Sequence, residues 1–416
     1  MLARARFTPR LALCLLAALI PAVAIARPAP DKTPRYRVDR VVLLIRHGIR
    51  APLDGEAAAA PLADQPFPHW DTPPSQLTPH GAQALGRLAD YERARLVRQG
   101  LLPAGGCPQA GSIAIWTNSK SRTIASGQAL AQGLAPGCPL AVDHLPEGQA
   151  DPLFDALDTP AVPFDARAAA ASINAELDNG RALMVGMGPA VATIERVLGC
   201  RAPCPISTQP NRIAPSADGK GLSLAGPIDL ASGTAQVFLL QYTEGMPLSQ
   251  VGWGRASAAD IATMSPLHAR LFDVFARSAY MAPRVGGLIA RRIAATLTAP
   301  QAPAFSVLVG HDNTIAAVTA LIGTGFTLPG YGRNDPPIGA GLLFERLVDT
   351  RTGRQLLRLS YLAQTPDQAR RLLPLPQAGA GAPLHPLSLG RCGTACTPAG
   401  FAQLIARQTR VLDQAK

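Results

Sequence analysis

The sequence is poor in lysine, in aromatic side chains and in charge of either sign. Only four lysines occur in 416 residues, aromatic residues make up 5% and charged residues 16%. Because hydrophobic residues reach 47%, the composition is that of a globular chain and excludes a disordered or fibrous protein. The net charge of +11 comes almost entirely from arginine, and no dense basic run with interleaved aromatics occurs. This argues against nucleic acid as a partner, whereas a basic balance favours anionic small-molecule substrates.

Long apolar runs are missing after the N-terminal segment. No stretch beyond residue 26 contains the roughly 18 uninterrupted apolar residues that suggest a membrane span. Residues 1–26 instead predict a signal peptide, since three arginines precede an apolar segment, Leu11–Ile20, and a small-x-small site ends at Ala26. Cleavage after Ala26 would release a periplasmic or secreted chain with no membrane attachment. Its 36 basic and 28 acidic residues would give a net charge of +8.

The cysteines lack the spacing of a metal site. There is no CxxC pair and no histidine close to the cysteines, which argues against zinc. The sequence has seven cysteines, and six remain once the predicted signal peptide with Cys14 is removed. An even number of cysteines in an exported chain favours disulfides. Six cysteines allow 15 connectivities, of which pairing between sequence neighbours is the simplest and would close two tight loops and one longer loop. The six are Cys107, Cys138, Cys200, Cys204, Cys392 and Cys396.

Three apolar runs are each followed at once by polar residues, a pattern typical of buried strands in a parallel sheet. Helical patterns separate them, so the sequence predicts an α/β fold. Open α/β sheets place their chemistry at the carboxyl ends of strands, and here those ends carry cations and imidazoles. The runs and the residues that follow them are Val41–Ile45 with Arg46, His47 and Arg50; Ser112–Thr117 with Arg122; and Phe305–Gly310 with His311 and Asp312.

The remaining chain is predicted to be largely helical. One helix begins with Thr78 as N-cap and Pro79 at the first helical position. Residues 143–283 contain helical windows separated by Gly/Pro-rich breaks and no convincing strand, which indicates a mostly helical cap domain. The predicted organisation is a signal peptide (1–26), the first part of an α/β domain (27–142), the cap domain (143–283) and the second part of the α/β domain (284–416). Further predictions are a loop lead-in over 27–40, helices over Ala125–Gly133, Ala166–Leu177, Pro189–Leu198, Leu230–Thr243, Leu267–Ala279 and Val285–Leu297, a helix over Thr314–Ile322 capped by Asp312 or Asn313, a hairpin of Gly341–Val348 and Gln355–Gln364, and a last helix over Phe401–Leu412.

The cations and imidazoles at the strand ends suit a phosphate ester. A phosphomonoester carries nearly two negative charges, and the planar fork of arginine binds phosphate oxygens better than lysine does. Clustered guanidiniums disfavour a protonated imidazole and would keep one histidine neutral and nucleophilic in acid. A carboxyl beside the second histidine is a candidate proton donor to the departing alcohol.

RHGIRAP at Arg46–Pro52 together with GHDNT at Gly310–Thr314 resembles the histidine acid phosphatase family, in its branch of bacterial periplasmic phytases and glucose-1-phosphatases. The resemblance implies a phosphoglycerate-mutase-like central mixed sheet flanked by helices, with no metal and no organic cofactor. It also implies that the three nearest-neighbour cysteine pairs are disulfides. By the same resemblance, His47 is the nucleophile that forms a phosphohistidine, Asp312 is the proton donor, and Arg46, Arg50, Arg122 and His311 bind the phosphate. Further matching segments are Leu77–Gly81, Tyr91–Leu102, Cys107–Gln109, Gly133–Cys138, Glu244–Pro247, Gly252–Arg255 and Pro336–Arg346.

The sequence departs from the phytase pattern at positions that bear on the substrate. Leu53-Asp54 stand where phytases have Thr-Lys, and no second arginine lies two places after Arg122. Asn313-Thr314 inverts the usual order, and one bridge to the C-terminal tail is missing. Because RAPL and His69–Thr78 are closer to glucose-1-phosphatases, the substrate stays open between phytate and sugar phosphates such as glucose 1-phosphate.

Each assignment also has an alternative. His47 could lie in a surface turn, Asp312 could merely cap a helix, and Arg122 could be a solvated ion-pair partner. Agreement between motif and strand context favours the functional interpretation. A phosphoglycerate-mutase-like phosphotransferase and a non-catalytic periplasmic phosphate-ester binding protein are the alternative functions, and the oligomeric state is not predicted. The other side chains considered are expected to be structural or solvent-facing: His69, His80, His144, His268, His385, Glu244 and, as core packing, Trp253.

Overall fold

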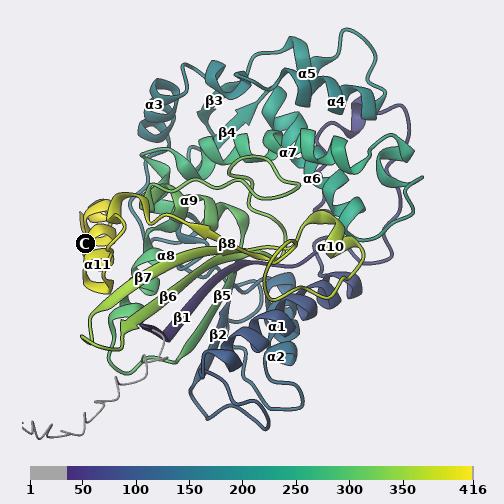
Figure 1. Cartoon of the computed structure of the whole chain (residues 1–416). Helices are drawn as coiled ribbons and strands as arrows, with labels where there is room; N and C mark the ends of the chain where they lie inside the picture. The colour runs from purple at the N-terminus through teal and green to yellow at the C-terminus, as the bar shows by residue number, and fades with distance from the viewer. Residues whose placement is uncertain (1–34, 415–416) are drawn as a thin grey trace, which may run out of the picture. The chain divides into compact units, whose positions relative to one another are not determined.

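A six-stranded mixed sheet forms the centre of the molecule (Figure 1). The computed structural model describes residues 35–414, so the predicted signal peptide lies outside the described residues. The strand order is β2-β5-β1-β6-β7-β8. β1 and β2 each pair in parallel with β5, and β1 pairs antiparallel with β6 on its other side. The strands are β1 (Tyr36–Arg46), β2 (Ile113–Thr117), β5 (Phe305–Gly310), β6 (Gly341–Asp349), β7 (Gln355–Leu362) and β8 (Leu384–Leu387).

The three predicted strands and the predicted hairpin are confirmed, with two differences at the edges of the sheet. β1 begins at Tyr36, inside the segment predicted to be a loop, because β6 extends beyond β5 and pairs Tyr36 with Asp349. β8 was not predicted. It has only four residues, one of them Pro386, and it pairs with β7 alone. Proline is tolerated in such an edge strand because the N–H groups on its open side have no partner strand to bond.

The sheet is covered by helices on both faces, which explains why residues 41–45 of β1 are all apolar. Successive strand residues point to opposite faces. Val41, Leu43 and Ile45 belong to one buried cluster with residues of α1 and α2, whereas Val42 and Leu44 belong to another with residues of α8 and α9. In Figure 1, α1 and α2 accordingly lie on one side of the sheet and α9 on the other. A strand buried on both faces has no polar alternation.

The helices agree with most of the predicted windows. Thr78 caps α1 through its side chain, which accepts a hydrogen bond from the Gly81 N–H at 2.8 Å. The predicted caps of α9 are wrong, since His311 occupies the N-cap position and makes no side-chain cap bond. The helices are α1 (Pro79–Arg98), α2 (Ser121–Leu134), α3 (Ala166–Glu176), α4 (Gly188–Leu198), α5 (Pro205–Thr208), α6 (Pro227–Thr243), α7 (Ala258–Phe272), α8 (Met281–Thr298), α9 (Asp312–Ile322), α10 (Pro366–Arg370) and α11 (Pro398–Gln408).

The segment predicted as a helical cap contains α3 to α7 and one short hairpin. The hairpin joins β3 (Arg212–Pro215) to β4 (Leu222–Ala225), so the expectation of no strand was wrong. Each strand has only four residues, too few for a visible alternation. The chain from Arg35 onward forms one compact unit, and the largest buried cluster runs from α6 and α7 into α8 and α9. The domain boundaries therefore stay a prediction.

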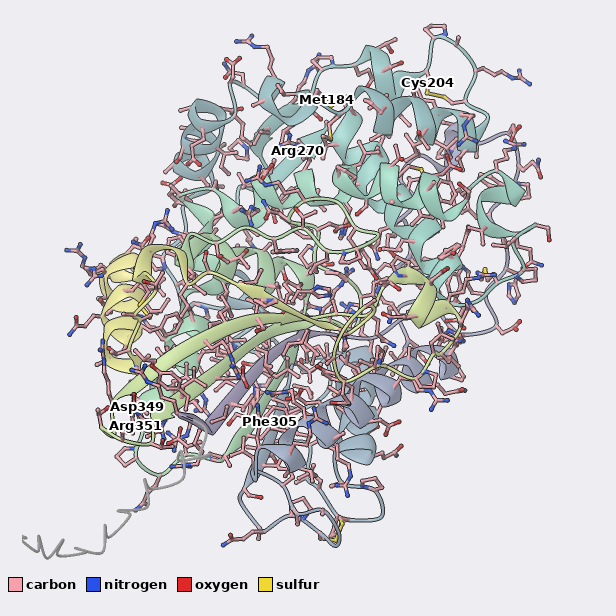
Figure 2. All side chains as sticks on the ribbon, viewed as in Figure 1. Met184, Cys204, Arg270, Phe305, Asp349 and Arg351 are labelled. Carbon is pink, nitrogen blue, oxygen red and sulfur yellow. A yellow bond between two sulfur atoms is a disulfide. The ribbon has the colours of Figure 1, made fainter. Side chains whose placement is uncertain are left out.

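The cysteines pair as the resemblance implied. The disulfides join Cys107 to Cys138, Cys200 to Cys204, and Cys392 to Cys396, and Figure 2 shows the one at Cys204 in the upper part of the molecule. The longest of these loops links the segment after α1 to the segment after α2. Within residues 35–414, no helix combines the length and the apolar character that a membrane crossing needs.

Candidate active site

The register of the three parallel strands brings the predicted polar residues to one edge of the sheet. Arg46 is paired with Gly310 across β1 and β5, and Thr117 is paired with Val309 across β2 and β5. The chain leaves each strand at the same level, where the His47 N–H donates to the Gly310 carbonyl at 3.0 Å and the Asn118 N–H donates to the Val309 carbonyl at 2.9 Å. The carboxyl ends of all three strands therefore meet at one place.

The loop that carries His47 is held by α1 and α2. The Gly48 N–H donates to the Ser126 hydroxyl of α2 at 3.0 Å. The Thr78 N–H at the start of α1 donates to the Ile49 carbonyl at 3.0 Å. Gly81 lies so close that a Cβ atom there would be 2.1 Å from the Ile49 oxygen. The helix start and the loop that carries His47 thus form one rigid contact.

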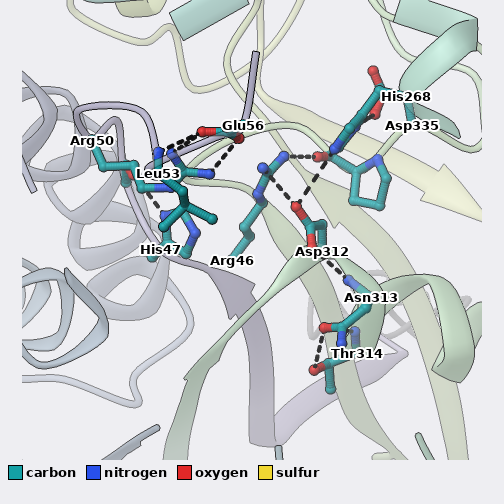
Figure 3. A network of polar contacts seen from close by, with 12 residues as sticks. Arg46, His47, Arg50, Leu53, Glu56, His268, Asp312, Asn313, Thr314 and Asp335 are labelled. Carbon is teal, nitrogen blue, oxygen red and sulfur yellow. Dashed lines mark hydrogen bonds and ion pairs between the residues drawn. The ribbon is translucent and has the colours of Figure 1, made fainter. Parts of the chain in front are cut away.

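A cavity of about 510 Å³ opens at this edge of the sheet. Five of the six predicted site residues line it: His47, Arg50, Arg122, His311 and Asp312. Arg46 lies behind Asp312, with its guanidinium bonded to the Asp312 carboxylate and to the Pro336 carbonyl, both at 2.7 Å (Figure 3). The sequence therefore predicted a group of residues that the fold does bring together.

His47 has its Nε2 atom free of intramolecular bonds in the described structure. Its Nδ1 lies 2.9 Å from the Gly48 carbonyl, which only accepts, so Nδ1 carries the proton and Nε2 keeps its lone pair. Burial, and then the positive charges of Arg122, Arg50 and Arg46, lower the pKa of His47 well below 6.5. The imidazole therefore stays neutral in acid, as a nucleophile requires.

Arg46, Arg50 and Arg122 each retain an unused hydrogen-bond donor at Nε. Their Nε atoms are buried and have no hydrogen-bond partner among the described residues. Burial, followed by the charge of Arg50, lowers the pKa of Arg122 to about 10, so Arg122 is still a cation at any acid or neutral pH. Fixed guanidinium donors around a neutral imidazole match the charge and the acceptor oxygens of a phosphate group.

His311 is oriented by a chain of bonds that starts at Asp155. The Asp155 carboxylate accepts from the Asn118 amide at 2.6 Å, which turns the Asn118 oxygen toward His311 Nε2 at 3.0 Å. Nε2 therefore donates, and Nδ1 is the remaining ring nitrogen. Burial and then the charge of Arg122 lower the pKa of His311 to about 3, whereas a bound phosphate dianion would raise it.

Asp312 is held as a carboxylate in this structure. Burial raises the pKa of Asp312, but the charge of Arg46, together with that of His268 and His311, outweighs burial and lowers the pKa below its ordinary value. One oxygen accepts from the Asn313 N–H at 2.8 Å and the other faces Arg46. Since Asp312 lines the cavity with 22% of its side chain exposed, a substrate can reach it.

Two features of the cavity were missed in the sequence. Glu56 binds Arg50 through both of its oxygens, each at 2.7 Å, and also accepts from the Leu53 N–H (Figure 3). No local pattern marks Glu56, because it lies in a loop whose conformation depends on α6. Its carbonyl oxygen would be 2.1 Å from a Cβ at Gly233.

His268 is the second missed feature. It was expected to be structural or solvent-facing, and the structure shows that it is buried and not solvent-facing. It projects from α7, is 6% exposed and lines the cavity. Its Nδ1 lies 2.7 Å from the buried Asp335 carboxylate and its Nε2 lies 3.8 Å from Asp312. The residue has no sequence motif, so only tertiary packing reveals it.

Acidic side chains also line the cavity, namely Glu56, Asp155, Asp229 and Asp312. Burial raises the pKa of Asp229. No group of three or more histidine, cysteine or acidic residues in the described part of the chain is arranged to hold a metal ion.

Comparison with known proteins agrees with this geometry. Residues 37–184 match the family described as histidine phosphatase superfamily (branch 2). Phytase AppA of Escherichia coli (strain K12) is 31% identical, over 94% of this chain and 96% of that protein. A glucose-1-phosphatase of Providencia rettgeri is 29% identical, over 86% and 88%. The structure of Hafnia alvei phytase in complex with myo-inositol hexakis sulphate superposes with a TM-score of 0.81 at 28% identity, covering 91% of this chain and 98% of that one. The chain therefore belongs to the histidine phosphatase superfamily, branch 2, as a histidine acid phosphatase related to bacterial phytases and glucose-1-phosphatases.

Proposed function

We propose that this phosphatase is exported and hydrolyses phosphomonoesters through a phosphohistidine at Nε2 of His47. The observation that carries the proposal is a neutral imidazole whose free Nε2 lies among three guanidinium groups. In the first step Nε2 attacks phosphorus, and the bond to the leaving alcohol breaks. In the second step water attacks the phosphohistidine, the N–P bond breaks and inorganic phosphate forms.

Asp312 transfers the proton that each of the two steps requires. The protonated carboxyl gives its proton to the departing alcohol, and the resulting carboxylate takes one from the attacking water. The bound phosphate dianion opposes the effect of Arg46 and raises the pKa of Asp312 during the cycle. Arg50, Arg122 and His311 line the cavity and are the proposed phosphate ligands, with Arg46 supporting them from behind Asp312.

The acidic residues of the cavity bear on the choice of substrate. Glu56, Asp155 and Asp229 oppose additional phosphate groups near the one being cleaved. Lys120 also lines the cavity and would attract such groups. Because three carboxylates outnumber this one lysine, a sugar monophosphate such as glucose 1-phosphate suits the cavity better than phytate. One of the relatives is named a phytase and another a glucose-1-phosphatase.

Export is supported by the N-terminal pattern and by the cysteines. Residues 1–26 have the composition of a signal peptide. All six later cysteines lie in disulfides, which persist in the periplasm or outside the cell.

The test begins with His47→Ala, which we expect to abolish hydrolysis of aryl phosphate and of glucose 1-phosphate while the circular dichroism spectrum is unchanged. Alkaline quenching of the wild-type enzyme with ³²P-labelled substrate should leave a label on His47 that is stable in alkali and lost in acid. Activity of the His47→Ala variant at the wild-type rate would refute the nucleophile.

Asp312→Asn tests the proton donor. The loss should be about 10²–10⁴-fold with an alkyl phosphate and much smaller with p-nitrophenyl phosphate, whose leaving group needs no proton. Equal losses with both substrates would reject the role. Transfer of phosphate to an alcohol without release of inorganic phosphate would support the phosphotransferase alternative, and tight binding without turnover would support the binding-protein alternative.

A further inference from the structure

His268 and Asp335 form a polar chain that ends at the proposed proton donor. Asp335 is 1% exposed and accepts from the Ser265 hydroxyl and from His268. The Ser265 hydroxyl in turn accepts from the Gly332 N–H at 2.7 Å. A carboxylate with these partners is fixed in place, and it holds the imidazole with Nδ1 protonated.

The other ring nitrogen of His268 faces the cavity. Nε2 lies 3.8 Å from the Asp312 oxygen that also contacts Arg46 (Figure 3). Closing that distance to a hydrogen bond needs a side-chain movement of about 1 Å. Phe272 packs edge-on against the ring with centroids 4.9 Å apart, so the imidazole moves within a defined slot. Asp335, His268 and Asp312 have the order carboxylate, imidazole and reacting group that orients a proton-transferring histidine in other enzymes.

We propose that His268, oriented by Asp335, is a positioning residue that shares one proton with Asp312 and supplies it to the donor when a phosphate ester binds. The inference rests on the proposed donor role of Asp312. In the free enzyme we place the shared proton on Nε2 of His268, whose ring lies between the carboxylates of Asp335 and Asp312. When a phosphate dianion binds beside Asp312, the proton passes from Nε2 to the Asp312 oxygen and His268 becomes neutral.

The proton count closes over one turnover. Asp312 gives the proton to the leaving alcohol and regains one from water when the phosphohistidine is hydrolysed. His268 gains and loses the same proton and is unchanged at the end. No other reactant is needed.

The charges around the pair explain why Asp312 needs such a neighbour. Arg46 lies 2.7 Å from Asp312 and favours the ionised carboxyl, which cannot donate. The imidazole of His268 lies 3.8 Å from the Asp312 carboxylate and 2.7 Å from the Asp335 carboxylate, so it can carry the proton where Asp312 alone cannot. The ionisable groups that face the pair are Arg46 from β1, His311 before α9, Asp335 from the loop before β6, Arg50 and Arg122 from across the cavity, and the tyrosines Tyr331 and Tyr361.

The experiment compares His268→Asn with the wild-type enzyme over pH 3–8, using an alkyl phosphate and p-nitrophenyl phosphate. With the alkyl substrate the alkaline limb of kcat/KM should move to lower pH by about one unit or more, and activity at pH 6 should fall about tenfold or more. With p-nitrophenyl phosphate the loss should be only a few-fold. Asp335→Asn keeps the shape of the side chain and should shift the limb in the same direction.

Leu271→Ala is the matched control, because Leu271 lies on the same helix and lines the same cavity without a titratable group. It should leave the alkaline limb and the leaving-group preference unchanged, whatever its effect on KM. A His268→Asn variant with the wild-type limb and a uniform loss on both substrates would overturn the inference. Asp312→Asn, measured in parallel, separates the two proposals. Should it lose the same factor on both substrates, the donor role itself fails. A leaving-group effect in Asp312→Asn without one in His268→Asn rejects only the role of His268.

Discussion

The contact between the start of α1 and the loop that carries His47 predicts a large effect of adding one methyl group. Gly81 has no Cβ, and a Cβ built there would lie 2.1 Å from the Ile49 oxygen. Real Cβ atoms essentially never come within 3.0 Å of a heavy atom outside their own stretch of chain. Gly81→Ala must therefore separate the helix from the loop by about 1 Å in a densely packed region.

Both activity and stability should suffer. Ile49 is two residues from His47 and adjacent to Arg50, and a misplacement of about 1 Å at a reacting group costs roughly 10²-fold in rate. Crowding of a packed site costs about 1–3 kcal/mol, and the bond from the Thr78 N–H to the Ile49 carbonyl, about 1 kcal/mol, is strained as well. We expect kcat to fall about 100-fold and the free energy of unfolding in urea to fall by about 2–3 kcal/mol.

Gly86→Ala is the matched control, since Gly86 lies in the same helix and a Cβ there meets nothing within 4 Å. Alanine is the better helix former, so this variant should gain about 0.5–1 kcal/mol of stability and keep its kcat. If Gly81→Ala instead behaved like Gly86→Ala in both assays, α1 would not position the loop that carries His47, and the prediction would be refuted.

Three further predictions concern the cavity, the pH dependence of stability and the disulfides. Glu56→Gln removes a carboxylate beside the phosphate site. The inhibition constant of inorganic phosphate should therefore fall several-fold, and that of inositol hexakisphosphate should fall further. A rise in either constant would contradict this prediction. Glu244, expected at the surface, is half-buried against the Thr78 hydroxyl, and burial raises its pKa to about 7. Between about pH 4.5 and 7 the folded state therefore binds more protons than the unfolded state, so stability falls by about 1–3 kcal/mol as pH rises, and urea titrations should show a flatter profile for Glu244→Gln. Replacing Cys107 and Cys138 by alanine should lower the unfolding free energy by about 3–4 kcal/mol, with little effect on KM because the bridge lies outside the cavity.

Local patterns were sufficient for most of the architecture. The apolar runs of β1, β2 and β5 are legible because both faces of these strands are buried, as Val41 and Val42 on opposite faces illustrate. Thr78-Pro79 marked the start of α1 because N-cap chemistry is local. The predicted helix boundaries were wrong where a local signal was not used. The start of α7 was predicted at Leu267, whereas its capping box of Ser257 and Asp260 lies well before that residue.

The sequence by itself also predicted the candidate site residues, because the residues after each parallel strand must meet at one edge of the sheet. His47, Arg122 and Asp312 were found in that way, and all three line the cavity. What it could not determine is how these groups are tuned. The partners that do so, Glu56 and His268, come from a loop and a cap helix.

Only the tertiary structure shows that Glu56 and His268 reach the cavity. His268 and Asp335 are 67 residues apart in the chain and 2.7 Å apart in space, and no periodicity encodes such a pair. The tautomer of His47, the ionised state of Asp312 and the double contact of Glu56 with Arg50 depend on burial and on charges a few ångströms away. Local motifs thus identified the family and the candidate site residues, whereas the protonation states of those residues arise from long-range packing.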